Sequence, residues 1–315
     1  MKVVLDTDGG LDDALAILTA VNLLPPGTVV GITTVFGNVD LHQATHNVKK
    51  VLEVSKDPSI PVYSGARAPL VSSVEATEKW DGHGPDGMGG VAGIAEDRGV
   101  QPNDAVPALI KYARMYPGEL VVIPIGPATN IALAIAADPS FVSNVAQVLY
   151  MGCTIKGEGN VTPHAEFNTA CDPEACQAML TAFAGKLTVV GWEFTLEHGL
   201  PWSIYHDLCA IDTPEARFLR GICATYETHQ HEMPFVLCDV YTAVLLVDPA
   251  YVLHSKLATC SVNLSDGPLR GACTWTDATD AAAAIKVIWK VDNDRFVSVL
   301  RRLVQGDVHL YLDKP

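Results

Sequence analysis

The chain has 315 residues, of which 49% are apolar and 18% are charged, and its formal net charge at pH 7 is -15. This composition suits a large buried core and excludes disorder as a description of the whole chain. The negative charge would repel a phosphate backbone, so we expect no nucleic-acid partner.

Short apolar runs alternate with segments of helical period along the chain. Strands are predicted at KVVLD (2–6), TVVGITTVFGN (28–38), ELVVIPIG (119–126), AQVLYMG (146–152) and LTVVGWEF (187–194), and helices at DDALAILTAVNLL (12–24), LHQATHNVKKVLEVS (41–55), ATNIALAIAADP (128–139) and DPEACQAMLTAFAG (172–185). Strands that are apolar throughout indicate burial on both faces, and their alternation with helices favours parallel βαβ units. We predict one α/β domain over residues 1–315, with a mostly parallel, Rossmann-like central sheet flanked by helices and a site at the C-terminal ends of the strands.

Two long regions interrupt this alternation, residues 66–102 and 196–237. Long segments of this kind in compact domains are usually lids or binding elements. We therefore predict mobile loops at about residues 76–90 and 223–237.

The cysteines and the apolar runs bear on the cellular location. The eight cysteines form no C-x-x-C pair, and we expect them to be reduced and mostly packed in the core. No basic start leads into an apolar segment of about 7 to 15 residues, and no apolar run approaches the ~20 residues of a membrane span. We expect a cytoplasmic protein with no membrane partner.

The stretch VVLDTDGGLDDALAIL (3–18) places four aspartates, Asp6, Asp8, Asp12 and Asp13, directly after the first predicted strand. It fits neither the G-x-G-x-x-G dinucleotide fingerprint nor the G-K-[ST] phosphate loop. Four carboxylates in one turn would raise each other's pKa unless a cation relieved the repulsion, and Ca²⁺ or Mg²⁺ binds oxygen ligands alone. The alternative, that Asp12 and Asp13 only cap a helix, leaves the other two acids unexplained.

Polar side chains follow other predicted strands. Asn38 ends TTVFGN, GEGNVTPHAEFN contains Asn160, Glu166 and Asn168, and Asp239 stands at the front of an apolar helix. Glu166 and Asn168 would face the same side of an extended segment. Asn and Glu suit a ligand with many hydroxyls, because each hydroxyl both donates and accepts hydrogen bonds. Individually, Asn38 could be a turn residue, and Asn168 and Asp239 could be helix caps.

The motif DTDGGLDDALAI resembles the aspartate motif of the nucleoside hydrolases, calcium-dependent enzymes that cleave the N-glycosidic bond of ribonucleosides. The similarity extends over most of the chain, because GITTVFGN, IPIGPATNIALA, VLYMGC, GNVTPHAEFNTACDPEA and DVYTAVLLVDP follow in the order and rough spacing of that family. The aspartate motif alone is moderately specific, whereas its combination with AEFN and DPEA is highly specific. The resemblance implies hydrolysis of ribonucleosides to free base and ribose, a role in purine and pyrimidine salvage, and a homodimer or homotetramer.

The resemblance also implies a calcium site. Asp8 would contact the ion and act as the general base that takes a proton from a calcium-bound water. Asp13 would hold Ca²⁺ through both carboxylate oxygens, and Asp239 and the backbone carbonyl of Ile125 would complete the protein ligands. Asp6 would support these acids from behind.

Further implied residues contact the sugar. They are Asp12 and Asn168 at the 2′ and 3′ hydroxyls, Asn160 and Glu166 at the 5′ hydroxyl, Asn38 at the water and the sugar, and Met151 and Phe167 along the ribose. Cleavage passes through an oxocarbenium-like state, which carboxylates close to the ring stabilise. Because water arrives from the face opposite the base, we expect inversion at C1′.

The sequence departs from the family at two positions. Gly9 stands where many members have proline, which adds backbone freedom but leaves the acids in place, so we expect a minor effect. Cys238 stands where well-known inosine- and pyrimidine-cleaving members have histidine. An ordinary thiol, with a pKa near ~8.5, is a poor proton donor, so Cys238 is a weak candidate for the leaving-group acid.

Other candidates for leaving-group chemistry lie in the two predicted loops. His83, His229 and His231 titrate in the right range. Trp80 or Tyr226 could stack on the base and raise its basicity. Each of these residues could equally be a loop residue without a catalytic role.

Two other functions are open on the sequence alone. The D-x-D-G order also resembles the motif of haloacid-dehalogenase-type phosphatases, in which Asp6 would attack phosphorus with Mg²⁺ bound. That assignment leaves Asp13 and AEFN without a use, and the chain shows no later GD pair followed by Asp for Mg²⁺. The second is a non-catalytic nucleoside sensor on the same scaffold, because a fold does not determine a function.

Overall fold

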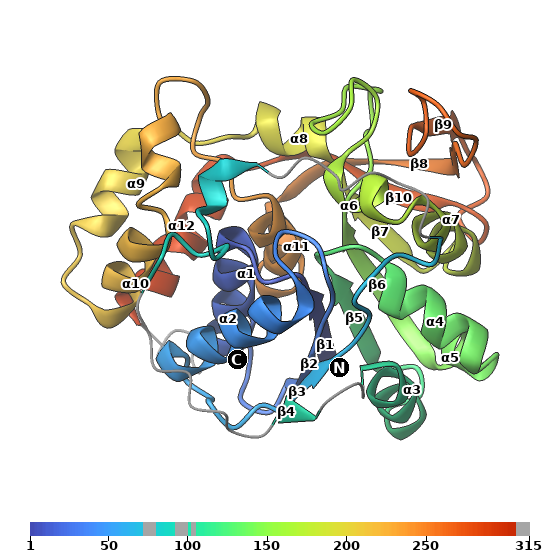
Figure 1. Cartoon of the computed structure of the whole chain (residues 1–315), viewed down its shortest axis with the longest axis horizontal. Coiled ribbons are helices and arrows are strands. Elements are labelled where there is room, and N and C mark those ends of the chain that lie inside the picture. Colours follow the sequence, from blue (N-terminus) through green and yellow to red (C-terminus); the bar gives the residue numbers. More distant parts are fainter. Residues whose placement is uncertain (72–79, 92–99, 102–104, 307–315) are drawn as a thin grey trace.

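Ten strands form the central sheet in the part of the chain that the structure describes. The computed structural model describes residues 1–71, 80–91, 100–101 and 105–306 (Figure 1). The strands are β1 (Lys2–Thr7), β2 (Val29–Thr34), β3 (Val62–Ser64), β4 (Val100–Gln101), β5 (Leu120–Pro124), β6 (Val145–Met151), β7 (Leu187–Val190), β8 (Val252–Val262), β9 (Cys273–Asp277) and β10 (Ile285–Val291). Their order is β4-β3-β2-β1-β5-β6-β7-β10-β8-β9, parallel from β4 to β10 and antiparallel where β8 pairs with β10 and β9. The predicted α/β fold with a mostly parallel sheet is confirmed.

Helices cover both faces of the sheet. They are α1 (Leu11–Leu23), α2 (Leu41–Val54), α3 (Ala105–Met115), α4 (Thr129–Ala137), α5 (Ser140–Asn144), α6 (Phe167–Cys171), α7 (Pro173–Ala182), α8 (Trp192–Glu197), α9 (Trp202–Cys209), α10 (Pro214–Ile222), α11 (Cys238–Val247) and α12 (Asn293–Gln305), with short 3₁₀ helices η1 (Asp81–His83), η2 (Tyr226–His229) and η3 (Pro249–Tyr251). Successive strand side chains point to opposite faces, so Val3 and Leu5 of β1 join one apolar core and Val4 joins the other. Helices α1, α2, α11 and α12 build the first core, and α3, α4, α5 and α7 build the second on the opposite face (Figure 1).

The strand predicted over residues 28–38 is shorter than expected. It ends at Thr34, and the chain then turns so that the backbone N–H of Asn38 donates to the Asp8 carboxylate. The apolar composition of Val35 and Phe36 reflects burial in this turn, which a pattern of hydrophobicity does not separate from a buried strand.

The strand predicted over residues 187–194 was also too long. It ends at Val190, where its pairing with Met151 stops, and the remaining residues begin α8. Glu193 favours this helix start, because an acid in the first turn complements the helix dipole. The chain thus leaves the sheet at its carboxyl edge and enters a helix that borders the site.

The region over residues 196–237, read from the sequence as a long excursion, is largely helical. Helices α9 and α10 pack against α12, with Leu208, Leu219 and Leu300 in the same core. The predicted mobile loop at 223–237 contains η2, and residues 76–79 of the other predicted loop lie outside the described residues. The mobility of both loops stays a prediction.

The eight cysteines, all within the described residues, form no disulfide with one another. Six of them are buried, and Cys238 and Cys260 are partly buried. Within the described ranges, no helix combines the length and the apolar character that crossing a membrane requires.

The turn between β1 and α1 depends on Gly9. Its φ is +73°, in the left-handed region, and a Cβ at this position would lie 2.7 Å from the Cα of Ala44 in α2. Proline has φ near about −65° and cannot adopt this conformation. In this chain the turn therefore takes a course that proline would not permit, and the expectation that the difference has only a minor effect on the acids stays a prediction.

Gly27 allows a matched test of this packing, because it has the same φ of +73° but no atom within 4 Å of a built Cβ. We expect Gly27→Ala to lower the free energy of unfolding by about 1–2 kcal/mol, the cost of the left-handed conformation alone. Gly9→Ala should cost a further ~1–3 kcal/mol, because its Cβ meets the backbone of α2. Urea unfolding followed by circular dichroism measures the free energy of unfolding of both variants. Equal losses would show that α2 shifts to accommodate the added Cβ without cost.

Candidate active site

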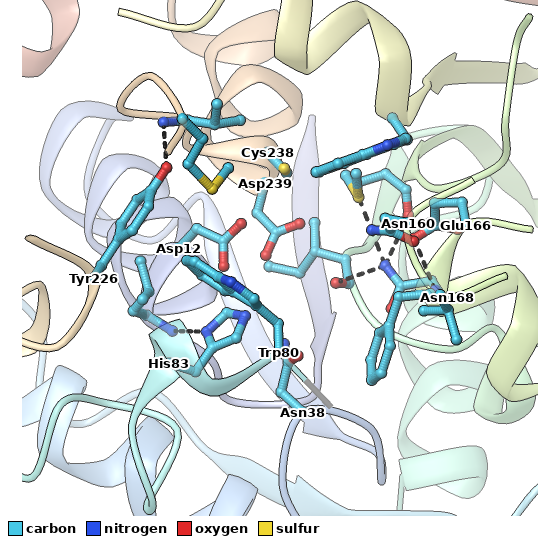
Figure 2. Close-up of a pocket in the computed structure, with 18 of the residues that line it drawn as sticks. Asp12, Asn38, Trp80, His83, Asn160, Glu166, Asn168, Tyr226, Cys238 and Asp239 are labelled. Atoms are coloured by element: carbon cyan, nitrogen blue, oxygen red, sulfur yellow. Dashed lines mark hydrogen bonds between the residues drawn. The ribbon is translucent and has the colours of Figure 1, made fainter. Parts of the chain in front are cut away.

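The carboxyl ends of five neighbouring parallel strands, β2, β1, β5, β6 and β7, converge on one cavity of about 600 Å³. Of the residues predicted from the sequence, those that line it are Asp12, Asn38, Trp80, His83, Ile125, Met151, Asn160, Glu166, Phe167, Asn168, Tyr226, Cys238 and Asp239. Figure 2 shows Asp12 and Asp239 at its centre, with Asn160, Glu166 and Asn168 on one side and His83 and Tyr226 on the other. The structure thus brings together residues that are up to about 230 positions apart in sequence, as βαβ topology allows.

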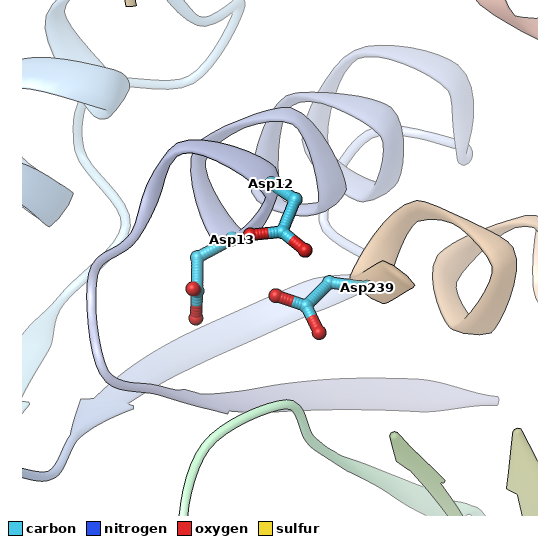
Figure 3. A group of neighbouring side chains, drawn as sticks. All are labelled: Asp12, Asp13 and Asp239. Atoms are coloured by element: carbon cyan, nitrogen blue, oxygen red, sulfur yellow. The ribbon is translucent and has the colours of Figure 1, made fainter. Parts of the chain in front are cut away.

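Three buried carboxylates lie at the floor of this cavity. Oxygens of Asp12 and Asp13, from the start of α1, and of Asp239, from the start of α11, lie within 4.8 Å of one another (Figure 3). Burial, and then the charge of Asp13, raises the pKa of Asp12 to about 7, and burial and the charge of Asp12 raise the pKa of Asp239 well above its ordinary value. None of the described residues that line the cavity is lysine or arginine. This donor set fits a divalent cation, whose charge would offset the repulsion.

Asp13 is oriented by the turn that precedes α1. Its carboxylate accepts hydrogen bonds from the Thr7 hydroxyl, from the backbone N–H of Asp8 at 3.2 Å and from that of Gly10 at 2.9 Å. These donors hold the carboxylate in one orientation without adding a full positive charge. A bound cation would therefore still be attracted by the negative charge of the Asp13 carboxylate.

Asp8 lies beside this group but, like Asp13, is not among the residues that line the cavity, and it is held by Asn38. The backbone N–H and the side-chain amide of Asn38 donate to the two oxygens of Asp8, at 2.8 and 3.0 Å. Burial and then the charge of Asp13 raise the pKa of Asp8 well above its ordinary value. The group of three nearby carboxylates contains Asp12 rather than Asp8, although the sequence analysis assigned Asp8 to the metal and Asp12 to the sugar.

Asp6 lies in β1 and is not among the residues that line the cavity. Its Oδ1 accepts from Thr33 at 2.5 Å and from Asn130 at 2.7 Å, and its burial raises its pKa to about 7. A carboxylate held in this way is poorly placed to attack a ligand in the cavity. This geometry disfavours the phosphatase alternative, in which Asp6 is the nucleophile.

Glu166 and Asn168 adopt a different local structure from the one expected. The segment is not extended: Glu166 is the N-cap of α6, and its carboxylate accepts from the backbone N–H groups of Cys153, Asn168 and Thr169 at 2.7–3.0 Å. Despite these bonds, burial raises the pKa of Glu166 to about 7. The side-chain amide of Asn168 donates to the carbonyl oxygens of Met151 at 3.1 Å and of Ile125 at 3.3 Å, beside the acids.

Comparison with known proteins decides the family. The model of the inosine-uridine preferring nucleoside hydrolases matches residues 3–298 of the chain. The chain belongs to this family.

The relatives cover nearly the whole chain. It is 32% identical to the inosine-uridine preferring nucleoside hydrolase of Crithidia fasciculata over 81% of this chain and 82% of that protein. It is 29% identical to the probable uridine nucleosidase 1 of Oryza sativa subsp. japonica over 97% of both chains. A solved inosine-guanosine nucleoside hydrolase matches the fold with a TM-score of 0.87 and 30% identity, covering 96% of this chain and 98% of that one.

Family membership settles the class of reaction. The chain is a hydrolase that acts on N-ribosyl bonds and releases base and ribose from ribonucleosides. The family is metal-dependent, and Asp12, Asp13 and Asp239 form a possible acidic metal site in this nucleoside hydrolase.

The thiol of Cys238 lies in the lining of the nucleoside hydrolase cavity, 3.3 Å from the hydroxyl of Thr195. That hydroxyl donates to the carbonyl of Trp192 at 2.7 Å, so the thiol is left as the donor to Thr195. Burial, and then the charge of Asp12, raises the pKa of Cys238 well above its ordinary value. Cys238 therefore holds its proton and directs it toward Thr195.

His83 lines the opposite part of the cavity as a neutral imidazole. Its Nδ1 accepts from the backbone N–H of Leu11 at 3.3 Å, and burial lowers its pKa to about 4. Since Nδ1 accepts, the neutral ring carries its proton on Nε2. His83 can thus donate one hydrogen bond without carrying a charge.

The two segments at the cavity mouth meet through aromatic rings. The ring of Trp80 lies 4.9 Å from that of Tyr226 and 5.6 Å from that of His229. The Tyr226 hydroxyl donates to Pro234 O at 2.9 Å and accepts from Val236 N at 2.7 Å, so its polar atom is already bonded.

The remaining two predicted histidines lie outside the cavity lining. His229 lies 3.4 Å from Asp81 and 3.1 Å from Glu232, while His231 is exposed to solvent. These positions favour His83 over both as a group that contacts the base.

The sequence analysis missed several residues that line the cavity, among them Leu11, Trp192, Met233 and Val236. Trp192 had a usable signal, because it directly follows a predicted strand whose carboxyl end must border the site. Assigning it to the strand itself concealed that signal. The others come from elements whose approach to the cavity depends on tertiary packing.

The buried acids predict how a divalent cation and pH act together. The pKa of Asp12 is about 7 in the folded chain, whereas its ordinary value is 3.8. Between about pH 4 and about pH 7 the unfolded chain therefore loses this proton while the folded chain keeps it, and the free energy of unfolding falls as pH rises through this range. A cation binds the deprotonated acids, so it should raise the melting temperature more at about pH 7.5 than at about pH 5. Thermal scans with chelator or with added cation measure this, and Asp239→Asn should lose most of the cation effect. Equal shifts at both pH values would contradict cation binding at these acids.

Proposed function

We propose that the chain hydrolyses ribonucleosides at a calcium site. Its protein ligands would be Asp13, Asp239, the carbonyl oxygen of Ile125 and either Asp12 or Asp8. The observation that carries this proposal is the group of three buried carboxylates, two of which line a cavity with no lysine or arginine among its described lining residues. Ca²⁺ takes about 6–8 oxygen ligands, so a few protein oxygens leave room for two ribose hydroxyls and water. When bound, the ion supplies a positive charge that orients these groups.

Asp8 is proposed as the general base. Its two oxygens are oriented by Asn38, which leaves a lone pair on each for the attacking water. A cation beside Asp13 would offset the negative charge that helps to raise the pKa of Asp8, which would favour the deprotonated form that accepts a proton. Its carboxylate also favours positive charge that develops on the sugar ring.

The ribose subsites follow from the polar groups on the opposite side of the cavity. Glu166 Oε1 accepts one backbone N–H, from Asn168, and keeps capacity for the 5′ hydroxyl, with Asn160 beside it. The 2′ and 3′ hydroxyls would bind Asp12, which is one of the three clustered acids, and Asn168, which lies beside them. Met151 and Phe167 offer apolar surface along the sugar.

The base would leave toward Trp80, His83 and Tyr226. A hydrogen bond from His83 Nε2 to the departing base fits its neutral state, whereas the Cys238 thiol donates to Thr195. The homodimer or homotetramer and the cytoplasmic location stay predictions from the sequence.

Replacement of Asp8 by asparagine tests the general base. We expect Asp8→Asn to lower kcat about 10²–10⁴-fold while nucleoside affinity changes little. The assay is base release from inosine, adenosine, guanosine, uridine and cytidine, with and without chelator and with p-nitrophenyl phosphate alongside. Asp40→Asn is the matched control, because Asp40 is exposed and asparagine also caps a helix well.

The outcomes of this assay separate the candidate functions. Base release that chelator abolishes and that Asp8→Asn removes supports the proposal. Base release unaffected by chelator would overturn the metal site, and phosphate release without base release would restore the phosphatase alternative. A chain that binds nucleosides without turnover would be a sensor.

A pair of variants tests the leaving-group assignment. Cys238→Ala should lower kcat less than about tenfold, because its thiol proton is directed to Thr195, whereas His83→Ala should lower kcat by about 10²-fold through loss of a donor. Both are measured on the best nucleoside of the panel. A larger loss in Cys238→Ala than in His83→Ala would reverse the assignment.

A further inference from the structure

The loop that follows β6 carries two of the proposed sugar-binding residues, Asn160 and Glu166, at the cavity. Glu166 is fixed by its place at the start of α6, and the exposed Asn160 is tied to the residue before Glu166, because the backbone N–H of Asn160 donates to the carbonyl of Ala165 at 3.2 Å. The segment that leads from β6 to this turn, residues 155–158, needs a fixed point of its own if Asn160 is to meet a ligand at hydrogen-bond distance.

Glu193 in the first turn of α8 provides such a fixed point. Its Oε2 accepts from the backbone N–H of Ile155 at 2.6 Å, and its Oε1 accepts from the N–H groups of Lys156 at 2.8 Å and Glu158 at 2.9 Å. The side chain is buried, with 3% of the residue exposed. A buried carboxylate is costly unless it is hydrogen-bonded, so three amide donors make this conformation of residues 155–158 strongly preferred.

The start of α8 packs closely against residues 153–155 of the loop. A Cβ at Gly191, the N-cap of α8, would lie 2.4 Å from the Cγ2 of Ile155. The backbone N–H of Trp192 donates to the carbonyl of Cys153 at 3.0 Å. Two residues beyond the last amide bonded by Glu193, Asn160 reaches the cavity.

A second carboxylate on the same helix offers a contrast. Glu197 pairs with the ammonium of Lys156, but both side chains are well exposed to solvent. Exposed ion pairs contribute little, whereas the buried Glu193 bonds to the backbone itself. The two acids therefore separate loss of charge on α8 from loss of the buried hydrogen bonds.

We propose that Glu193 is a positioning residue that holds residues 155–158 so that Asn160 binds the 5′ hydroxyl of the nucleoside. This inference rests on the proposed function, specifically on the 5′ subsite at Asn160 and Glu166. Glu193 does not contact the substrate. Its effect is on recognition of one hydroxyl.

The test compares a ribonucleoside with its 5′-deoxy analogue, for example uridine with 5′-deoxyuridine or inosine with 5′-deoxyinosine. Glu193→Gln keeps the shape but places an NH₂ group against at least one backbone N–H donor. We expect kcat/KM for the ribonucleoside to fall about 10–100-fold, and that for the 5′-deoxy analogue to fall less than about threefold. Glu197→Gln is the matched control and should change neither substrate by more than about twofold.

A double-mutant cycle with Asn160→Ala locates the effect. If Glu193 acts through Asn160, Glu193→Gln should cause little further loss in the Asn160→Ala background. Thermal unfolding confirms that the variants are folded at the assay temperature. If Glu193→Gln is not, Glu193→Asp, which keeps the charge but shortens the reach, is used with the same expected pattern.

Each result decides a different question. Equal losses on both substrates, or full additivity with Asn160→Ala, would overturn the positioning role of Glu193. A parent enzyme that hydrolyses the ribonucleoside and its 5′-deoxy analogue at the same rate would instead overturn the proposed 5′ subsite. No base release by the parent enzyme would overturn the proposed function.

Discussion

Repulsion between buried carboxylates is the constraint on which the rest of the site depends. Asp12, Asp13 and Asp239 lie within 4.8 Å of one another, with Asp8 beside them, and burial and mutual charge raise the pKa of Asp8, Asp12 and Asp239. Either protons or a cation must offset that charge. A protonated carboxyl group cannot take a further proton from water, so compensation by a cation is the one compatible with a carboxylate that acts as a base.

The protein orients its acids with neutral donors instead of basic side chains. Asp13 is held by a hydroxyl and two backbone N–H groups, Asp8 by the two donors of Asn38, Glu166 by three amides, and Glu193 by three more. Such donors determine the orientation of a carboxylate while most of its charge remains. Lysine or arginine in these places would form ion pairs and compete with the metal. The same kind of hydrogen bonding thus orients the proposed metal ligands, the proposed sugar-binding residue Glu166 and Glu193, which we propose positions the loop.

The opposite side of the cavity has different chemistry, because it would face the planar base of the proposed nucleoside. Trp80 and Tyr226 present aromatic surface, and His83 is kept neutral by burial with Nδ1 bonded to the start of α1. Cys238 is also uncharged, because burial keeps its thiol protonated. The cavity therefore pairs a charged floor, suited to a cation and hydroxyls, with a neutral wall suited to a base. A nucleoside bound as we propose would span both.

The sequence by itself determined the fold class, the acidic turn after β1 and the set of polar residues at the strand ends, because these depend on local patterns of hydrophobicity and charge. Tertiary structure decided the rest. The end of β7 at Val190, the hydrogen bond that Glu166 accepts from the loop after β6 and the packing of the turn at Gly9 depend on partners distant in the sequence, namely Met151, Cys153 and Ala44. Likewise, only the folded chain distinguishes Glu193, whose carboxylate is buried against residues 155–158, from the exposed Glu197 on the same helix. Hydrogen-bond distances and burial are properties of packing, and a single sequence carries no direct record of which distant backbone groups a side chain will meet.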